Sequence, residues 1–315
     1  MSAFKSVFAE HLDGYVALQR ALGLSFETQS YMLRTFDDFV VSVAHQGRLT
    51  QHLATEFASA ASTKGMVARR YEVVRNFSVY LATVVPGSPT LDRNTARRSE
   101  PRTPARIFSD AELENLVNGA RISSRRSSIR GHALATMIGL GASNGLRPAE
   151  VVRLDRRDVD WAKGVLEIRC TKFKKDRLVP LHPSCVEALR KYAGDRDATF
   201  PSPPCEAFFL NAHGARFASA AFEGAFRDLI RRLGMREPRG RGPTFGDLRH
   251  TFAVRRLVAW YREGVDVQAK LPVLATFMGH VEYSHTAYYI TATPELQGLA
   301  EGRLKRWLDG EEVAP

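Results

Sequence analysis

A proline- and arginine-rich break after the first quarter of the chain most constrains how this protein can fold. The segment VPGSPTLDRNTARRSEPRTPAR, from Val85 to Arg106, holds four prolines, one glycine and five arginines, and its apolar residues show no periodicity. Proline cannot continue the interior of a helix or a central strand, so a packed element cannot run through this segment. The sequence therefore predicts two domains, residues 1–85 and 107–315, joined by a basic linker at 86–106.

The first domain is predicted to be a bundle of four helices. Apolar residues recur at helical steps, some less regularly than others, in four segments: Phe4 to Leu18, Tyr31 to Val43, Gln51 to Ser62, and Val67 to Leu81. Such spacing places apolar side chains on one face of a helix. Arg69, Arg70 and Arg75 lie largely off the apolar face of the last helix. They predict a basic surface, although a solvated face is the simpler interpretation for any one of them.

The second domain is predicted to combine helices with a small antiparallel sheet. Ser109 and Glu112 have the spacing of a capping box, which starts a helix. The segments GVLEIRC and RLVPL flank the polar turn TKFKKD, which favours a β-hairpin, and AFFLN is a candidate third strand. Helices return from Ser219 onward. The predicted fold class is therefore mainly α with a small antiparallel β-sheet.

The charge balance favours a polyanionic partner. Lys and Arg number 45 against 34 for Asp and Glu, which gives a net charge of +11. An excess of this size is typical of proteins that bind nucleic acid. An anionic membrane surface is the weaker alternative, because no Lys-rich amphipathic segment stands out. No segment approaches the ~18 apolar residues of a membrane span.

The cysteines and the first residues of the chain indicate a cytoplasmic protein. Cys170, Cys185 and Cys205 match neither a disulfide framework nor a zinc pattern, so we expect reduced, buried thiols. The opening residues include acids and a histidine where a signal peptide has an apolar run.

Two segments of the second domain carry positive charge at positions suited to a phosphate. In NGLRPAEVVRL, Arg147 stands at a predicted helix start, where backbone N–H groups also favour an anion, and Glu150 can orient it. In TKFKKDRLVPL, the turn carries Lys172, Lys174 and Lys175, which can bring an ammonium group to a phosphate or a leaving oxygen. A surface ion pair and a solvated loop are the plain structural alternatives.

Two further segments supply imidazole and phenol groups. FGDLRHTFAVRRL places Arg249 and His250 near a predicted helix start, and GHVEYSHTAYYI holds His280 followed by Tyr288 and Tyr289. Aromatic residues near a C-terminus usually pack a last helix onto the core. None of the four segments defines a function by itself.

Together, the four segments resemble the tyrosine recombinase family of phage integrases, Xer-type recombinases and transposon recombinases. GLRPAEVVRL looks like the first arginine box, TKFKKDRLVPL like the β-hairpin lysine segment, DLRHTFA like the second arginine box, and MGHVEYSHTAYY like the Gly-His motif before the nucleophile. The resemblance implies an N-terminal SAM-like core-binding domain and an α+β catalytic domain with a C-terminal tail helix.

The resemblance also implies a role for each residue. Tyr289, nine residues after His280, falls at the position of the nucleophile, and Tyr288 is one residue early. The other catalytic positions are Arg147 and Arg249 as the phosphate clamp, Lys172 as general acid, His280 as a donor to a phosphate oxygen, and Glu150 and His250 as supporting residues. DNA contacts are expected from Arg69, Arg70, Arg75, Arg97, Arg98, Lys174 and Lys175. Bond energy kept in a phosphotyrosine would allow strand exchange without ATP, metal or cofactor.

One position departs from the family pattern. The second arginine box usually begins with a histidine three residues before its arginine, and here that residue is Gly246. Glycine has no side chain that can donate or accept a proton. We therefore expect a slower reaction, or help from a neighbouring group or a water.

These observations leave more than one function open. The first is a site-specific recombinase that acts through a 3′-phosphotyrosine in integration, excision or transposition of a mobile element. The alternatives are a catalytically weakened accessory protein that binds DNA, and a relaxing topoisomerase of related chemistry. The expected partners are double-stranded DNA with inverted half-sites and further copies of the chain, from dimer to tetramer, or related recombinases. A nucleoid location and no membrane contact follow from this expectation.

Overall fold

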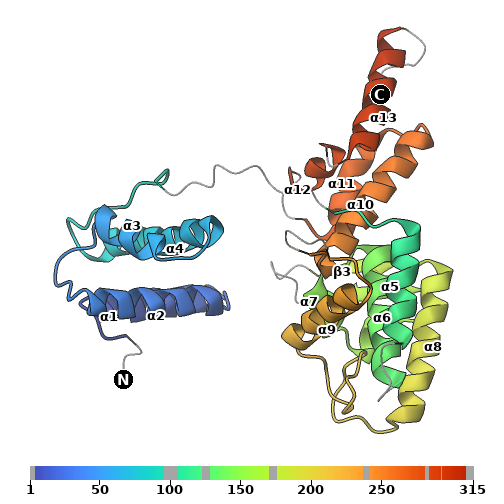
Figure 1. Ribbon diagram of the computed structural model, residues 1–315, viewed down its shortest axis with the longest axis horizontal. Coiled ribbons are helices and arrows are strands. Elements are labelled where there is room, and N and C mark those ends of the chain that lie inside the picture. Colours follow the sequence, from blue (N-terminus) through green and yellow to red (C-terminus); the bar gives the residue numbers. More distant parts are fainter. Residues whose placement is uncertain are drawn as a thin grey trace. The chain divides into compact units, whose positions relative to one another are not determined.

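In the computed structural model the chain forms two compact units, Met1–Arg102 and Thr103–Pro315 (Figure 1). The described residues are 4–95, 106–122, 128–169, 176–236, 242–280, 284–291 and 293–309. Several residues singled out from the sequence lie outside these ranges: Arg97, Arg98, Cys170, Lys172, Lys174 and Lys175.

The first unit contains the four predicted helices. They are α1 (Ala9–Ala21), α2 (Glu27–Ser42), α3 (Gln51–Ser59) and α4 (Lys64–Val84). The helices enclose an aromatic core in which the ring of Phe8 contacts those of Phe36 and Phe77. Phe8 precedes α1 rather than lying inside it, but its side chain is buried as the periodicity required. Thr50 and Thr63 cap α3 and α4 with their side-chain oxygens.

The three arginines of α4 differ in their surroundings. Arg69 is exposed. Arg70 Nη1 donates to the carbonyl of Phe57 at 3.4 Å, and its guanidinium lies 5.0 Å from the centre of the Phe57 ring. Arg75 Nη1 donates to Asn76 at 3.2 Å. Arg70 therefore also packs α4 against α3, whereas Arg69 is directed to solvent.

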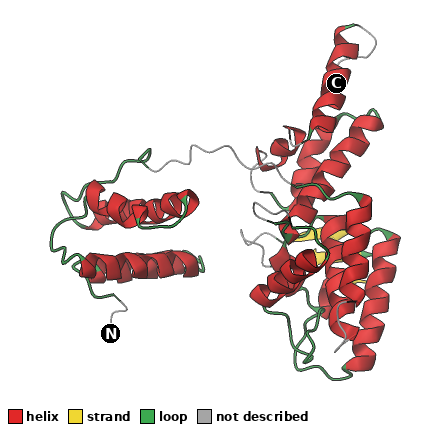
Figure 2. Cartoon of the chain, viewed as in Figure 1, coloured by secondary structure: helices red, strands yellow, loops and turns green. Residues whose placement is uncertain are grey.

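The second unit is mainly helical (Figure 2). Its α-helices are α5 (Asp110–Ile122), α6 (Ser128–Asn144), α7 (Pro148–Arg153), α8 (Pro183–Thr199), α9 (Ser219–Arg232), α10 (Phe245–Arg262), α11 (Val267–Met278), α12 (Ser284–Ala287) and α13 (Pro294–Leu308). Two 3₁₀ turns complete them, η1 (Arg156–Asp158) and η2 (Tyr288–Thr291). The apolar helix α6 packs against α5, α8 and α10. The predicted capping box is confirmed, because Ser109 Oγ accepts from Glu112 N–H and Glu112 Oε2 accepts from Ser109 N–H.

A three-stranded antiparallel sheet lies in the second unit. It has the order β1 (Val159–Asp160), β2 (Val165–Ile168), β3 (Arg177–Pro180), and Leu166 pairs with Val159 on one side and Val179 on the other. The predicted hairpin is confirmed, since β2 and β3 are its two strands. The candidate third strand at AFFLN is wrong, because that segment forms only isolated bridges. Its phenylalanines, Phe208 and Phe209, instead pack into the core against a tyrosine of α8.

Two surface properties bear on the remaining expectations. Cys185 and Cys205 are free thiols, as predicted, but both are half-buried rather than buried. The prediction of burial was wrong for Cys185 because it lies in the first turn of α8, where its Sγ contacts Ser143 Oγ at 3.3 Å.

Among the described helices, none has the length and apolar character to cross a membrane.

Candidate active site

Three arginines from distant parts of the second unit meet at the end of α11. The three consecutive carbonyls of residues 277–279 accept hydrogen bonds from Arg177 Nε (2.8 Å), Arg249 Nη2 (2.6 Å) and Arg147 Nη2 (2.9 Å), in that order. The C-terminal end of a helix carries partial negative charge, so it favours this gathering of cations. The end of α11 thus holds the arginines of both predicted boxes side by side.

Gly279 makes this arrangement possible. It ends α11 in the left-handed conformation, with φ of 66°, which is unfavourable for residues that have a Cβ. A Cβ at this position would lie only 2.8 Å from Arg177 Nη1. The glycine therefore both turns the chain out of the helix and leaves space for a guanidinium.

One carboxylate orients two of the arginines. Glu150 Oε1 accepts from Arg147 Nη1 at 2.8 Å and from Arg177 Nη1 at 3.0 Å, and its Oε2 accepts from Arg177 Nη2 at 2.8 Å. Burial acts to raise the pKa of Glu150, but the hydrogen bonds and charge of Arg177, followed by those of Arg147, outweigh it and hold the pKa at about 2. Glu150 is therefore ionised and braces both guanidiniums. Pro148 is the first residue of α7, and the backbone N–H of Arg147 donates a hydrogen bond to Glu150 Oε2. Both features fix the start of this helix.

Arg249 is the most deeply buried of these cations. Its Nη1 donates to the carbonyl of Gly145 at 2.6 Å. Burial, and then the positive charge of Arg147, lower the pKa of Arg249 to about 10, so it still carries its charge at neutral pH. Three guanidiniums lie here with one carboxylate, which accepts hydrogen bonds from two of them, and a guanidinium has five N–H donors. The cluster therefore retains positive charge and donors for an anionic ligand, and a phosphate meets guanidinium groups with matching geometry.

Tyr289 lies beside the arginine cluster. It belongs to η2, and its side chain is only 3% exposed. Burial raises its pKa, while the positive charges of Arg249 and Arg147 oppose that rise. Its hydroxyl lies 3.1 Å from His250 Nδ1. The phenol is therefore protonated at rest, with a cationic cluster and a possible proton acceptor next to it.

His280, the second predicted histidine, also packs against Tyr289. The ring of His280 stacks on that of Tyr289 with 6.2 Å between centres, and His280 Nδ1 lies 2.7 Å from Thr286 Oγ1. Tyr288 packs edge-on against Tyr289, at 5.9 Å, and contributes to the apolar cluster around α10 and α11. Of the adjacent tyrosines, Tyr289 thus has its hydroxyl at His250, beside the arginine cluster. The ring of Tyr288 packs against Tyr289 and the apolar cluster.

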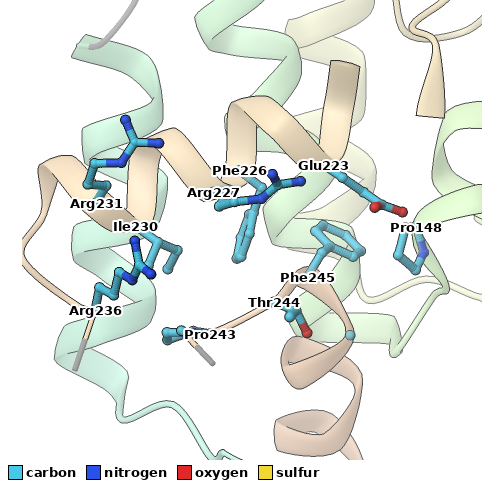
Figure 3. Close-up of a pocket in the computed structure, with 12 residues that line it drawn as sticks. Pro148, Glu223, Phe226, Arg227, Ile230, Arg231, Arg236, Pro243, Thr244 and Phe245 are labelled. Carbon is cyan, nitrogen blue, oxygen red and sulfur yellow. The ribbon is translucent and has the colours of Figure 1, made fainter. Parts of the chain in front are cut away.

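Gly246, the second residue of α10, has open space around its Cα. A Cβ built there would meet only Thr244 Oγ1, at the ordinary contact distance of 3.5 Å. Gly246 borders a cavity of about 580 Å³, shown in Figure 3. Its lining includes three arginines and three large apolar residues: Arg227, Arg231 and Arg236, with Phe226, Ile230 and Phe245. Its described lining contains no histidine, so no residue of that cavity supplies the imidazole that Gly246 lacks.

The structure therefore brings together most of the catalytic and supporting residues singled out from the sequence. These are Arg147, Glu150, Arg249, His250, His280 and Tyr289, whereas the lysines of the hairpin turn lie outside the described residues. Sequence reasoning missed Arg177, whose only signal was a charge at the start of a β-rich segment. No group of three or more metal-binding side chains occurs in the part of the chain that the structure describes.

Comparisons with known proteins agree with this geometry. The statistical model of the phage integrase family matches residues 107–295. A protein of Sinorhizobium fredii named as an integrase/recombinase, y4rE, is 41% identical over 311 residues, which cover 98% of this chain and 99% of that protein. A second one from the same organism, y4rB, is 31% identical over 96% of this chain and 99% of its own length.

The chain therefore belongs to the phage integrase family, the tyrosine recombinases. Their activity is DNA strand exchange in site-specific recombination. The tyrosine recombinase XerC of Chlamydia caviae is a more distant relative, 25% identical over 77% of this chain and 72% of its own.

Solved structures share the fold. The XerH site-specific recombinase, in a post-cleavage complex with its palindromic difH substrate, has a TM-score of 0.66 at 16% identity, over 88% of this chain and 78% of its own. The integrase of the transposon Tn1549, in complex with transposon right end DNA, has a TM-score of 0.63 at 15% identity, over 94% of this chain and 99% of that one.

Proposed function

We propose that this protein cuts and rejoins double-stranded DNA at specific sites through a covalent bond between Tyr289 and a DNA 3′-phosphate. The observation that carries the proposal is the Tyr289 hydroxyl, which lies at His250 beside a cluster of three arginines, two of them paired with Glu150. A hydroxyl nucleophile next to surplus guanidinium charge suits attack on a phosphodiester, where negative charge develops on the nonbridging oxygens.

In the proposed reaction, Tyr289 Oη forms a bond to phosphorus and the bond from phosphorus to the 5′-oxygen breaks. The phenol loses its proton and the departing 5′-oxygen gains one. Arg147 and Arg249 hold the nonbridging oxygens, His280 donates to one of them, and Lys172 protonates the leaving oxygen. Attack by the 5′-hydroxyl of another strand reverses the chemistry and rejoins DNA without ATP, because the phosphotyrosine retains the bond energy.

We also propose that the protein acts as an oligomer, from dimer to tetramer, on inverted half-sites of a mobile element, in association with the nucleoid. The two units would hold one half-site between them, with residues 1–85 as the core-binding domain and 86–106 as the basic strap. The net charge of +11 supports a DNA partner. Among the solved relatives, a lambda integrase dimer is bound to a core site, which supports a DNA-bound dimer as the smallest assembly.

Gly246 supports a second candidate, a DNA-binding accessory protein with weakened catalysis. Removing one donor to a developing oxyanion typically costs about 10²–10³ in rate. We propose that the protein still cleaves, more slowly than it would with a histidine at position 246, because the rest of the site is assembled.

The test begins with finding the DNA. Protein–DNA adducts are purified under denaturing conditions from cells that express the tagged protein, and the attached DNA is sequenced. A duplex with that sequence and a nick beside the cleavage position then traps the adduct, because the short released strand diffuses away. Wild type should give a protein band shifted by the attached DNA on a denaturing gel.

Matched phenylalanine variants assign the nucleophile. Tyr289→Phe removes only the hydroxyl, so it should bind the duplex as wild type does and form no adduct. Tyr288→Phe should form the adduct. If the two results are exchanged, the nucleophile is Tyr288. If wild type binds a defined site and forms no adduct there, the accessory function is the correct one.

A further inference from the structure

Gly246 has no side chain that could take up or give a proton, and a histidine lies one helical turn away. His250 follows Gly246 by four residues on α10, and residues four apart share one face of a helix. A side chain at position 250 therefore projects from the same face as the residue that the family pattern expects at position 246.

Contacts of His250 with Tyr289 are direct. His250 Nδ1 lies 3.1 Å from Tyr289 Oη, and the two rings are 5.4 Å apart at an interplanar angle of 57°. This distance is within the range at which a general base takes a proton. The nearest alternative is His280, but its Nδ1 faces Thr286 Oγ1 at 2.7 Å and its ring stacks on the tyrosine ring.

We propose that His250 is the general base of this recombinase and takes the proton from the Tyr289 hydroxyl. This inference rests on the proposed function of Tyr289. As Oη bonds to phosphorus, its proton passes to His250 Nδ1. When a 5′-hydroxyl later attacks and Oη leaves, the imidazolium returns that proton to the phenolate. No further reactant is needed, so protons balance over a complete exchange.

The electrostatics of the site agree with an acceptor. Burial lowers the pKa of His250, Asp247 on the same helix opposes that effect, and Arg249 adds to it. Among the described residues, Tyr289 is the titratable group that contacts it from another element. A histidine with a lowered pKa is neutral at physiological pH, and in the tautomer with the proton on Nε2 its Nδ1 accepts from the phenol. It is therefore in the form that a base requires before the reaction begins.

The decisive measurement is the rate of adduct formation in a single turnover, with protein in excess over the nicked duplex, across about pH 5 to 8, where a histidine titrates. The wild-type rate should rise with pH as His250 loses its proton, and then level off. His250→Asn keeps a polar group near the position of Nδ1 but cannot take up a proton. It should bind the duplex normally, lose the histidine-dependent rise, and cleave about 10²–10⁴ times more slowly, the usual contribution of a general base.

Two further measurements separate a base from a structural residue. In His250→Gly, added imidazole should restore adduct formation in proportion to the concentration of neutral imidazole. A duplex with sulfur in place of the scissile 5′-oxygen needs no proton on its leaving group. This substrate should therefore rescue Lys172→Ala, which lacks the proposed acid, and should not rescue His250→Asn.

The outcomes distinguish this inference from the function on which it rests. If wild type forms no Tyr289-dependent adduct, the proposed function fails. If wild type forms the adduct and His250→Asn keeps the wild-type rate and pH profile, only the assignment of His250 is overturned. Rescue of His250→Asn by the sulfur substrate would also overturn it, since His250 would then act on the leaving group.

Discussion

At the scale of single residues, Gly246 separates what the fold requires from what the chemistry requires. Its Cβ would make only an ordinary contact, and its backbone is not left-handed. Gly246→Ala should therefore leave stability unchanged or raise it by up to about 1 kcal/mol, because alanine restricts the unfolded chain and favours helix. The free energy of unfolding from urea titration measures the effect.

Gly141 provides the matched control on the neighbouring helix α6. A Cβ there would lie 2.5 Å from the ring of Phe245, so the packing of α6 against α10 would have to shift. Gly141→Ala should cost about 1–3 kcal/mol, as overpacking of a core does. Equal destabilisation by both substitutions would mean that the helix start needs a glycine at 246. A neutral Gly246→Ala would instead permit Gly246→His as a test of whether an imidazole there accelerates cleavage.

Glu150 should make stability depend on acid pH. Its pKa falls from 4.5 in the unfolded chain to about 2 in the folded protein, so the folded state favours the carboxylate. That contribution to stability is fully present above pH 4.5 and is lost as the pH falls through about 2. The stability gap between wild type and Glu150→Gln, measured by urea unfolding at a series of pH values, should narrow over this interval. A gap that stays constant with pH would contradict the assignment.

At the scale of elements, the ends of β3 and α11 are joined through Arg177. The Arg177–Glu150 pair is almost fully buried, and removing one member of a buried ion pair typically costs about 3–5 kcal/mol. Arg177→Gln should cost this much. It should also weaken DNA cleavage, because Glu150 would lose the partner that holds it against Arg147.

The control pair has similar geometry on the surface. Arg156 donates two hydrogen bonds to Asp197, at 2.9 and 3.0 Å, but both side chains are more than 40% exposed. Exposed pairs contribute about 0–1 kcal/mol, so Arg156→Gln should be nearly neutral. If both substitutions cost the same in thermal or urea unfolding, burial does not determine the strength of the Arg177 pair.

The elements themselves were largely predictable because their signals are local. Helical periodicity located α1 to α4, the Ser109 capping box located the start of α5, and two β-rich segments around a polar turn located β2 and β3. The strand β1 has only two residues, too few to show an alternation. AFFLN has the apolar composition of a strand, but a buried aromatic segment is apolar whether or not its backbone pairs with a neighbouring strand.

The site was predictable to the extent that motifs define it. The boxes named Arg147, Arg249, His280 and Tyr289 through their resemblance to the motifs of the tyrosine recombinase family. Arg177 was missed because its role depends on a carboxylate 27 residues away and a carbonyl 100 residues away, and no local pattern records such contacts. The bond between His250 and Tyr289 likewise joins two elements that only the folded chain brings together.

At the scale of the whole molecule, the first turns of α13 pack on its own unit, whereas its last turns expose apolar side chains. Leu296 is buried against the cluster around α10 and α11, and Leu299 packs beside it. Further along, Leu304, Trp307 and Leu308 are 55%, 45% and 69% exposed. The first part of the tail therefore packs on its own domain, and the last turns remain available to a second copy.

Charge substitutions can distinguish the buried start of α13 from its exposed end. The double variant Leu304→Glu, Leu308→Glu should fold and bind a single half-site as wild type does, but lose cooperative assembly on paired half-sites in a gel-shift titration. Deletion of residues 293–315 should have the same effect on assembly. Leu296→Glu buries a charge in the core and should lower the melting temperature instead. Unchanged cooperativity in the double variant would exclude the exposed last turns of α13 as a contact between copies.

The arginines gathered on the carbonyls of residues 277–279 also bear on the synthesis of the protein. Arg147 and its carbonyl partner are separated by 132 residues, and Tyr289 follows that partner by ten. The ribosome therefore completes the first unit, the three-stranded sheet and the helices α5 to α11 before the arginine cluster can close. With Tyr289 as the proposed nucleophile, a chain still on the ribosome would lack the group that attacks DNA until translation has passed residue 289, so interrupted synthesis would yield products without the proposed cleavage activity.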